Sequence, residues 1–156
     1  MNGVTVAPLS AEAVSAAIAL SLAVFPGGGE TSLRACFTGE SNRFFAATAD
    51  GMLVGFGGYS IAADQADVID VAVAPNFRRR GIARALVQAV LAAAQSEGAE
   101  SIFLEVRASN APALSLYTAL GFTVCGVRKN YYKNPREDAV LMTCDLCAVS
   151  AKSVEE

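Results

Sequence analysis

Four arginines gather around one glycine between Arg78 and Arg84, where a strand-like segment gives way to a helix-like one. The first turn of a helix leaves backbone N–H groups unpaired at the positive end of the helix dipole. Gly81 and Ala83 are small, so a ligand could approach this backbone closely. These features suit a pyrophosphate. A helix start with a solvated basic face explains the same residues, and on the residues alone that second interpretation is ahead.

Glu105 lies in a segment, 101–106, that is typical of a strand. Because side chains alternate along a strand, Glu105 shares one face with Phe103 and Arg107. A carboxylate beside a reacting amine can act as a general base. The alternative is an ordinary strand glutamate that forms a salt bridge with Arg107.

Tyr117 could donate a proton through its hydroxyl group. It falls at helical spacing with Leu114 and Leu120, which is typical of a core residue. The two roles are compatible, because a tyrosine can pack its ring and still present its hydroxyl.

The absence of histidine limits the chemistry available to these 156 residues. It excludes Ser-His-Asp triads and every imidazole acid–base mechanism. A catalytic base must then be a carboxylate, Lys, Cys or Tyr. Cys144 and Cys147 form a single C-x-x-C pair, which cannot complete a tetrahedral zinc site without two further ligands. We therefore expect no metal.

Charge and hydropathy exclude several partners. The formal net charge of −3 argues against nucleic acid. A hydrophobic content of 53% excludes disorder as the main state. The apolar run from Ala13 to Phe25 is too short to span a bilayer and is expected to form a buried helix. No membrane partner is expected, and the protein is predicted to be cytoplasmic; its oligomeric state stays open.

The order of elements predicts an α/β protein with one mixed sheet and helices on its faces. One domain is expected over 1–147, followed by a short tail at 148–156. The segment from Asp67 to Val106 reads as strand, helix, strand, so its two strands should be parallel. Strands are expected at 4–8, 42–48, 52–61, 67–73, 101–106, 122–129 and 138–145.

Capping residues and breakers predict the ends of four helices. Asp50-Gly51 is a strong hairpin signal between the second and third strands. The helices are expected from Ser10 to about Leu22, from a cap at Thr31 to Phe37, from Ile82 to a stop at Gly98, and from a cap at Asn110 to just before Gly121.

The run Arg78-x-x-Gly81-x-Ala83 resembles the acyl-CoA pyrophosphate motif of the GCN5-related N-acetyltransferase (GNAT) superfamily. Further motifs resemble its RimI type, whose members acetylate the N-terminal alanine of a small-subunit ribosomal protein. These motifs are L-E-V-R-x-S-N from Leu104, L-Y-x-x-L-G-F from Leu116, N-Y-Y from Asn130 and R-E-D-A from Arg136.

This resemblance implies the GNAT fold, a mixed and mostly antiparallel sheet whose central parallel strands splay apart, with helices on both faces. Acetyl-CoA would lie between the strands that end near Val73 and Val106. The residues that the resemblance assigns to the cofactor are Val71, Ala72, Val73, Arg78, Arg79, Arg80, Gly81, Ile82, Ala83, Arg84 and Asn110.

The same resemblance implies direct attack of a free amine on the acetyl thioester. Glu105 would be the general base and Tyr117 the general acid. Tyr131 and Tyr132 would line the peptide entrance, or else form an exposed aromatic hairpin that stacks on itself.

The Gly27–Glu30 stretch lacks the Pro-Trp pair frequent in RimI relatives, which leaves the acceptor open. Other protein N-termini, lysine or a small-molecule amine are alternative acceptors. An alternative of another class is a non-catalytic acyl-CoA-binding module.

Overall fold

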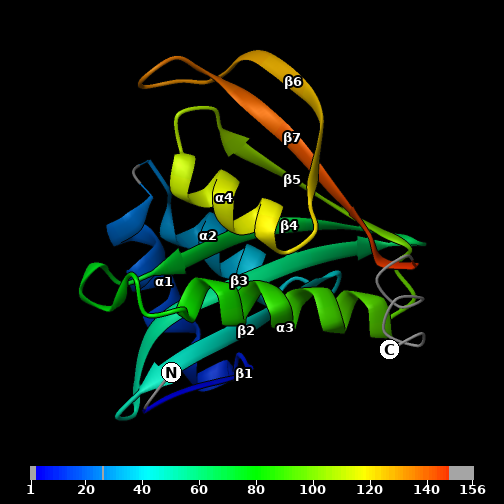
Figure 1. Ribbon diagram of the computed structural model, residues 1–156. Helices are drawn as coiled ribbons and strands as arrows, with labels where there is room; N and C mark the ends of the chain where they lie inside the picture. The colour runs from blue at the N-terminus through cyan, green and yellow to red at the C-terminus, as the bar shows by residue number, and fades with distance from the viewer. Residues whose placement is uncertain (1–2, 26, 148–156) are drawn as a thin grey trace.

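Residues 3–25 and 27–147, which the computed structural model describes, form one seven-stranded sheet with helices on both faces (Figure 1). The strand order is β1-β2-β3-β4-β5-β7-β6, and only β4 and β5 are parallel. This is the predicted mixed sheet with one central parallel pair. The predicted tail at 148–156 lies outside the described residues. The strands are β1 (Val4–Pro8), β2 (Asn42–Ala49), β3 (Met52–Ala62), β4 (Gln65–Val73), β5 (Ser101–Arg107), β6 (Thr123–Tyr132) and β7 (Glu137–Asp145).

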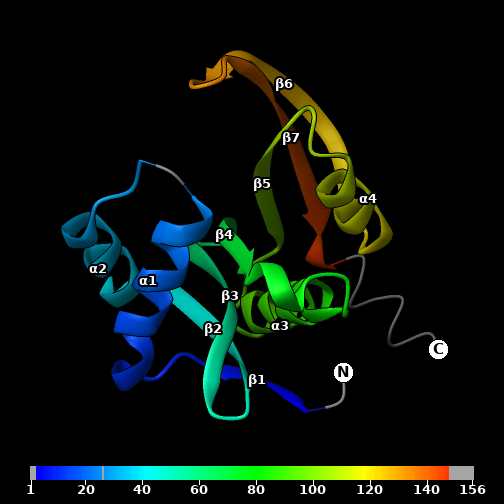
Figure 2. The same ribbon diagram turned by 90° about the vertical axis from the view of Figure 1, so that its left-hand side faces the viewer.

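Four α-helices cover the sheet. Figure 2 shows α1 and α2 on one face and α3 and α4 on the other. Their bounds are α1 (Val14–Val24), α2 (Glu30–Thr38), α3 (Ile82–Ser96) and α4 (Ala111–Ala119), with 3-10 turns η1 (Ala11–Ala13) and η2 (Pro75–Phe77).

Ser10 is the N-cap of the first helical segment, as predicted, although without a capping side-chain bond. The first turn is the 3-10 turn η1, and α1 begins at Val14. The helix is buried along one stripe and not all round, since Leu22 on the outer face is 42% exposed. The buried stripe is Val14, Ala17, Ile18 and Ser21. Within the described residues, no helix combines the length and the apolar character that a membrane span needs.

The predicted cap at Thr31 is two residues too late. Gly29, in extended conformation, is the N-cap of α2, and the helix already begins at Glu30, whose carboxylate lies near the positive end of the dipole. The cap at Asn110 is confirmed, since its Oδ1 accepts a hydrogen bond from the Ala113 N–H at 3.2 Å. Gly98, with φ of +96°, follows the end of α3 as predicted.

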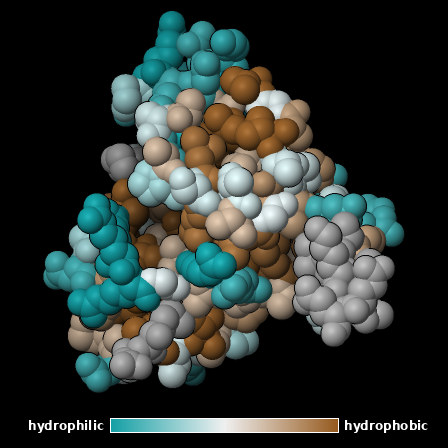
Figure 3. Space-filling view, in the orientation of Figure 1, coloured by the Kyte–Doolittle hydropathy of each residue, from teal (hydrophilic) through white to brown (hydrophobic). Residues whose placement is uncertain are grey.

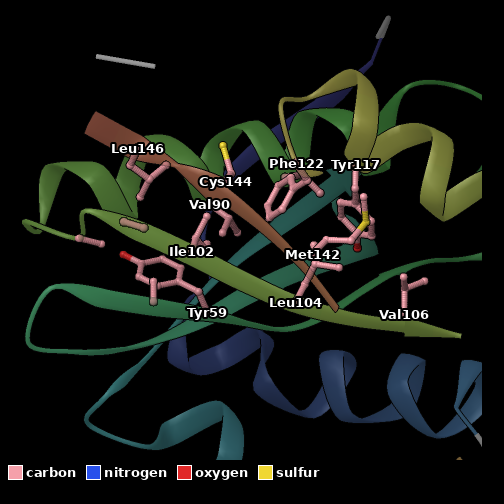
Figure 4. Packing of buried hydrophobic residues seen from close by; sticks show 14 residues of the cluster. Tyr59, Val90, Ile102, Leu104, Val106, Tyr117, Phe122, Met142, Cys144 and Leu146 are labelled. Atoms are coloured by element: carbon pink, nitrogen blue, oxygen red, sulfur yellow. The ribbon is translucent and has the colours of Figure 1, made fainter. Parts of the chain in front are cut away.

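Helix α3 fastens the two halves of the sheet together. Its apolar face is buried through Ile82, Leu86 and Val90. Ile82 and Leu86 pack toward β2 and β3, whereas Val90 belongs to the core cluster that includes β5 and β7. Figure 4 shows that cluster, with Val90 beside residues of the β5–β7 half.

The parallel pair β4–β5 stays together only at its beginning. Its pairs are Gln65–Ser101, Ala66–Ile102 and Asp67–Phe103. Immediately beyond, Ile69 and Asp70 both stand opposite Gly58 of β3, which makes a β-bulge in β4. The bulge redirects β4, so the two strands diverge toward their C-terminal ends (Figure 2).

Aromatic rings fill the space beneath α1 and α2. Phe37 lies 4.6 Å from Phe44 and 5.1 Å from Phe56 between ring centroids, in tilted and edge-to-face arrangements. Such pairs stabilise a core beyond the area that they bury. The cluster packs against β3 on the face opposite α3, and Ile69 of the β4 bulge packs against the cluster.

Gly58 offers a test of this packing. A Cβ at this position would overlap the Phe44 ring and lie 2.9 Å from the Arg43 carbonyl oxygen. We therefore expect Gly58→Ala to lower the free energy of unfolding by about 1–3 kcal/mol in urea titrations. The control is Gly28→Ala, whose Cβ would meet Leu33 at an ordinary 3.5 Å. The control should change stability by less than about 0.5 kcal/mol, and equal losses in both variants would contradict the close approach.

Candidate active site

A cavity of about 560 Å³ lies where β4 and β5 diverge. Five of the residues that the sequence singled out line it together. They come from both diverging strands, the start and middle of α4, and the end of β6, and they are Val71, Glu105, Asn110, Tyr117 and Tyr132.

A second cavity, of about 610 Å³, opens on the side of β6. Asp70 and Glu105 line both cavities, so the two spaces adjoin at these carboxylates. Tyr131 lines only the second cavity, and Tyr132 lines both. A substrate could therefore reach the strand divergence from two sides.

Glu105 is placed on β5 by strand alternation, as predicted. Its neighbours Leu104 and Val106 are buried in the core, whereas the Glu105 side chain is 31% exposed. It forms a salt bridge with Arg128 of β6, at 3.5 Å between Nε and Oε1, and it lies close enough to the Tyr131 hydroxyl to raise the pKa of that tyrosine. The carboxylate is thus held in place and remains open to the cavity.

The alternative of a salt-bridged Glu105 holds in part, because its partner is Arg128 and not Arg107. Arg107 pairs instead with Glu137 of β7, at 3.3 Å, and its guanidinium lies 4.3 Å from the centre of the Tyr132 ring. The cause is register, because β7 lies next to β5 and places Ala139 beside Arg107, near Glu137.

Tyr117 reaches the cavity from α4 while its ring packs in the core. It is 9% exposed, and its ring lies edge-to-face against Phe122 at 5.5 Å (Figure 4). Both roles considered for this residue are therefore compatible with its position. Burial, followed by the negative charge of Asp70, raises the pKa of Tyr117 to about 12. Its hydroxyl keeps its proton throughout the neutral range.

Tyr131 and Tyr132 stand at the end of β6. Their rings contact each other edge-to-face, 5.1 Å apart, as expected for an aromatic hairpin that stacks on itself. Both also line the cavities, so their position is compatible with either interpretation of this pair. Hydrogen bonding to Glu105 raises the pKa of Tyr131, and burial raises that of Tyr132. In Figure 3, hydrophilic surface gathers around this end of the β6–β7 hairpin.

The arginine loop lies apart from the two cavities, at the start of α3. Arg79 and Gly81 both have positive φ, +64° and +80°, so the backbone turns sharply before the helix. No atom lies within 4 Å of the place that a Cβ would take at Gly81. Arg78 donates from Nε to the Val73 carbonyl at 3.2 Å, and Arg80 stacks on Phe77 at 4.8 Å. Figure 3 shows a hydrophilic group over this loop.

The other residues assigned to the cofactor do not line either cavity. Ile82, the first residue of α3, and Val73 of β4 are buried between α3 and the sheet, and Ala72 is buried in the cluster beneath α1 and α2. Ala83 is partly buried and Arg84 exposed on the first turn of α3. Any role of these residues would pass through their backbone groups or, for Arg84, its charge.

Asp70 is the residue that the sequence analysis missed. It occupies the bulge of β4 and lines both cavities. It is open to solvent there, yet protein atoms surround it closely enough that burial raises its pKa to about 6. A signal existed in the sequence, because this aspartate interrupts the apolar run Val68-Ile69-Asp70-Val71 of a central strand.

The cysteines show free thiols. Cys144 is buried and Cys147 exposed, in agreement with side chains that point different ways. Among residues 3–25 and 27–147, no group of three or more His, Cys, Asp or Glu side chains is placed to hold a metal ion.

Known proteins resemble this chain in sequence and in fold. The acetyltransferase (GNAT) family model matches residues 15–122. The chain is 38% identical over 106 residues to the ribosomal protein bS18-alanine N-acetyltransferase of Escherichia coli strain K12, covering 67% of this chain and 72% of that protein. It is 39% identical over 116 residues to an N-alpha-acetyltransferase of Sulfurisphaera tokodaii, covering 66% and 69%.

The fold agrees with the crystal structure of the ribosomal-protein-S18-alanine N-acetyltransferase from Escherichia coli. The TM-score is 0.84 at 32% identity, over 92% of this chain and 94% of the other. The chain therefore belongs to the GNAT family of acetyltransferases. It is an acetyl-CoA-dependent N-acetyltransferase.

The raised pKa of Asp70 makes a prediction about stability. The folded-state pKa of about 6 exceeds the ordinary value of 3.8, so the folded protein binds this proton more tightly than the unfolded chain does. The contribution of Asp70 to the free energy of unfolding is then greatest at low pH and falls as the pH rises from about 4 to about 6. Asp70→Asn should therefore raise the melting temperature at about pH 8, and the gain should shrink toward about pH 4.

Differential scanning fluorimetry across this pH range is the measurement. Asp64→Asn, in the exposed turn between β3 and β4, controls for the loss of one negative charge. A melting temperature for Asp70→Asn below that of the wild type at about pH 8 would contradict the prediction.

Proposed function

We propose that this enzyme acetylates the N-terminal α-amine of a ribosomal protein, with alanine as the acceptor residue. The names of the relatives from Escherichia coli support this acceptor. The observation that carries the chemistry is that Glu105 and Tyr117, from different elements, line one cavity at the divergence of β4 and β5. Such a substrate places the enzyme in the cytoplasm.

The chemistry favours an α-amine over a lysine side chain. A protonated amine has no lone pair, so it must lose a proton before it can attack a carbonyl carbon. The pKa of an α-amine is about 8, against about 10.4 for lysine. At neutral pH, deprotonating the α-amine therefore costs less free energy than deprotonating the lysine side chain, in proportion to the difference between the two pKa values.

Glu105 is proposed to act as the general base. It is the carboxylate that both cavities share with Asp70, and Arg128 and Tyr131 hold it in one orientation. It can take a proton from the amine directly or through a water molecule. Tyr117 is proposed to act as the general acid, because its hydroxyl is protonated and lines the same cavity.

Acetyl-CoA supplies the acetyl thioester when it is bound. We infer that backbone N–H groups between Arg79 and Arg84 hold its pyrophosphate, since the positive φ at Arg79 and Gly81 and the open space at Gly81 form a cradle before α3. Asn110 and Val71 line the cavity from α4 and β4 and would contact the cofactor there. No metal enters this proposal.

Tyr131 and Tyr132 are proposed to contact the peptide. Tyr132 lines both cavities, and Tyr131 holds Glu105 through its hydroxyl. The first residues of an acceptor that places its amine near Glu105 would pass between these rings.

Two substitutions test the acid and the base. With a short peptide that starts with alanine, Glu105→Gln should lower kcat by about 10²-fold or more, and Tyr117→Phe should also lower it, because each removes a proton-transfer group. Thiol release from acetyl-CoA measures turnover. Both variants should bind acetyl-CoA like the wild type.

The peptide control has a blocked N-terminus and an internal lysine. Turnover of the free terminus alone supports the proposed acceptor. Turnover of the blocked lysine peptide alone would reassign the acceptor and leave the chemistry in place. Undiminished turnover in Glu105→Gln would exclude Glu105 as the base.

Two glycines at opposite ends of α3 test the pyrophosphate cradle. Gly81 and Gly98 both have positive φ, and neither has an atom within 4 Å of a Cβ position. Alanine at either should therefore cost a similar amount of stability, on the order of 1 kcal/mol. Only Gly81→Ala should raise the KM for acetyl-CoA, by several-fold, because only Gly81 borders the cradle.

Steady-state kinetics with varied acetyl-CoA and thermal unfolding separate the two effects. An equal rise of KM in Gly81→Ala and Gly98→Ala would trace the effect to general destabilisation and contradict the cradle.

A further inference from the structure

We propose that Asp70 is a second catalytic carboxylate, which binds the ammonium group of the substrate opposite Glu105 and takes the first of the two protons that the nitrogen loses. The proposal deepens the proposed function and rests on it, since it concerns the same acetylation of a free amine.

The position of Asp70 follows from the strand divergence. The bulge at Ile69 and Asp70 lies just beyond Asp67, the last residue of β4 paired to β5. Glu105 lies on β5, and it too comes after the last residue of its strand that is paired to β4, which is Phe103. Both carboxylates line both cavities, so they face the same space from the two diverging strands.

The partners of the two carboxylates differ. Glu105 is neutralised in part by Arg128. The carboxylate of Asp70 has no hydrogen-bond or ion-pair partner among residues 3–25 and 27–147. The nearby Arg107 is already paired with Glu137. An anion that has no such partner and lines both cavities offers a binding place to a cation that enters them.

Apolar side chains surround this anion. Val68, Ile69 and Leu104 line both cavities beside Asp70. Such walls disfavour the charged form of a carboxylate and so increase its tendency to take a proton. A carboxylate in these surroundings first attracts an ammonium group and then accepts its proton more readily than a solvated aspartate would.

A count of protons gives each group one step. The substrate enters as an ammonium with three N–H protons and leaves as an amide with one. Asp70 accepts the first proton, which frees the lone pair, and the nitrogen forms its bond to the acetyl carbon as the carbon–sulfur bond breaks. Glu105 accepts the second proton. Tyr117 gives its proton to the departing thiolate and regains one from Asp70, so that one proton is released to water per turnover.

The titratable groups near Asp70 are placed to exchange protons with it. Burial is the main cause of the raised pKa values of Tyr117 on α4, Tyr132 on β6 and Cys36 on α2, and the negative charge of Asp70 adds to each. Tyr132 is influenced by Glu105 as well, so it lies within electrostatic reach of both carboxylates. The remaining charged groups that line the two cavities are Asp67, Glu105, Arg107, Arg128 and Lys133.

The test compares Asp70→Asn with the wild type on the alanine-initiated peptide at saturating acetyl-CoA. In the wild type, kcat/KM should fall below about pH 6, where Asp70 becomes protonated. In Asp70→Asn, this fall of kcat/KM at acidic pH should disappear. The substitution should also lower kcat/KM by about 10²-fold and raise the KM for the peptide. The KM for acetyl-CoA should not change. Asp64→Asn, away from both cavities, should match the wild type.

A binding measurement isolates the ammonium contact from turnover. By calorimetry with CoA present, Asp70→Asn should weaken binding of the free-amine peptide at least several-fold. It should leave unchanged the binding of an analogue with a hydroxyl in place of the amine. A purely structural role for Asp70 would change both affinities alike and would overturn the proposal.

The outcomes separate the two proposals. If the wild type acetylates the peptide and Asp70→Asn keeps the wild-type peptide KM and the fall of kcat/KM at acidic pH, Asp70 has no such role. If the wild type acetylates only another amine, the proposed acceptor fails. The same comparison on that amine then decides the role of Asp70.

Discussion

The active site depends on the early end of hydrogen bonding between β4 and β5. Three residue pairs hold the strands together, and a bulge then turns β4 away. Backbone N–H and C=O groups are costly to leave unpaired inside a protein. On the diverging inner edges of this sheet, these groups are available to a ligand, except where the chain itself supplies a partner, as Arg78 does for Val73. The interruption of the sheet thus creates a binding site.

The rest of the fold confines this interruption to one end of the strand pair. Helix α3 packs on both halves of the sheet, and the buried cluster around Ile102 and Val90 joins them at the paired end. The aromatic cluster of Phe37, Phe44 and Phe56 stiffens β2 and β3 behind the bulge. The divergence is therefore a fixed feature of a rigid scaffold, which can hold reacting groups in place.

Three carboxylates, Glu105 and Asp70 in the cleft and Glu137 on the neighbouring β7, show how the surroundings of a carboxylate decide its chemistry. Hydrogen bonds from Ser109, with further help from Arg107, hold the pKa of Glu137 below its usual range, so this group serves to fix the β5–β7 edge. Glu105 is oriented by Arg128 and Tyr131 but stays open to the cavity. Burial raises the pKa of Asp70 to about 6. The same functional group is thus structural in one place and suited to proton transfer in the others.

The sequence by itself determined the order of elements and the parallel pair, because local periodicity and caps are properties of neighbouring residues, and its motifs singled out five of the residues that line the cavity at the strand divergence. Tertiary structure alone decided which charges pair. Glu105 meets Arg128 rather than Arg107 because β7 lies between β5 and β6, and bulges in β6 shift the register there. It also decided that Asp70 stands at the cleft, since a bulge is visible only when two strands are paired. Register and burial arise from contacts between distant segments, and no local pattern contains them.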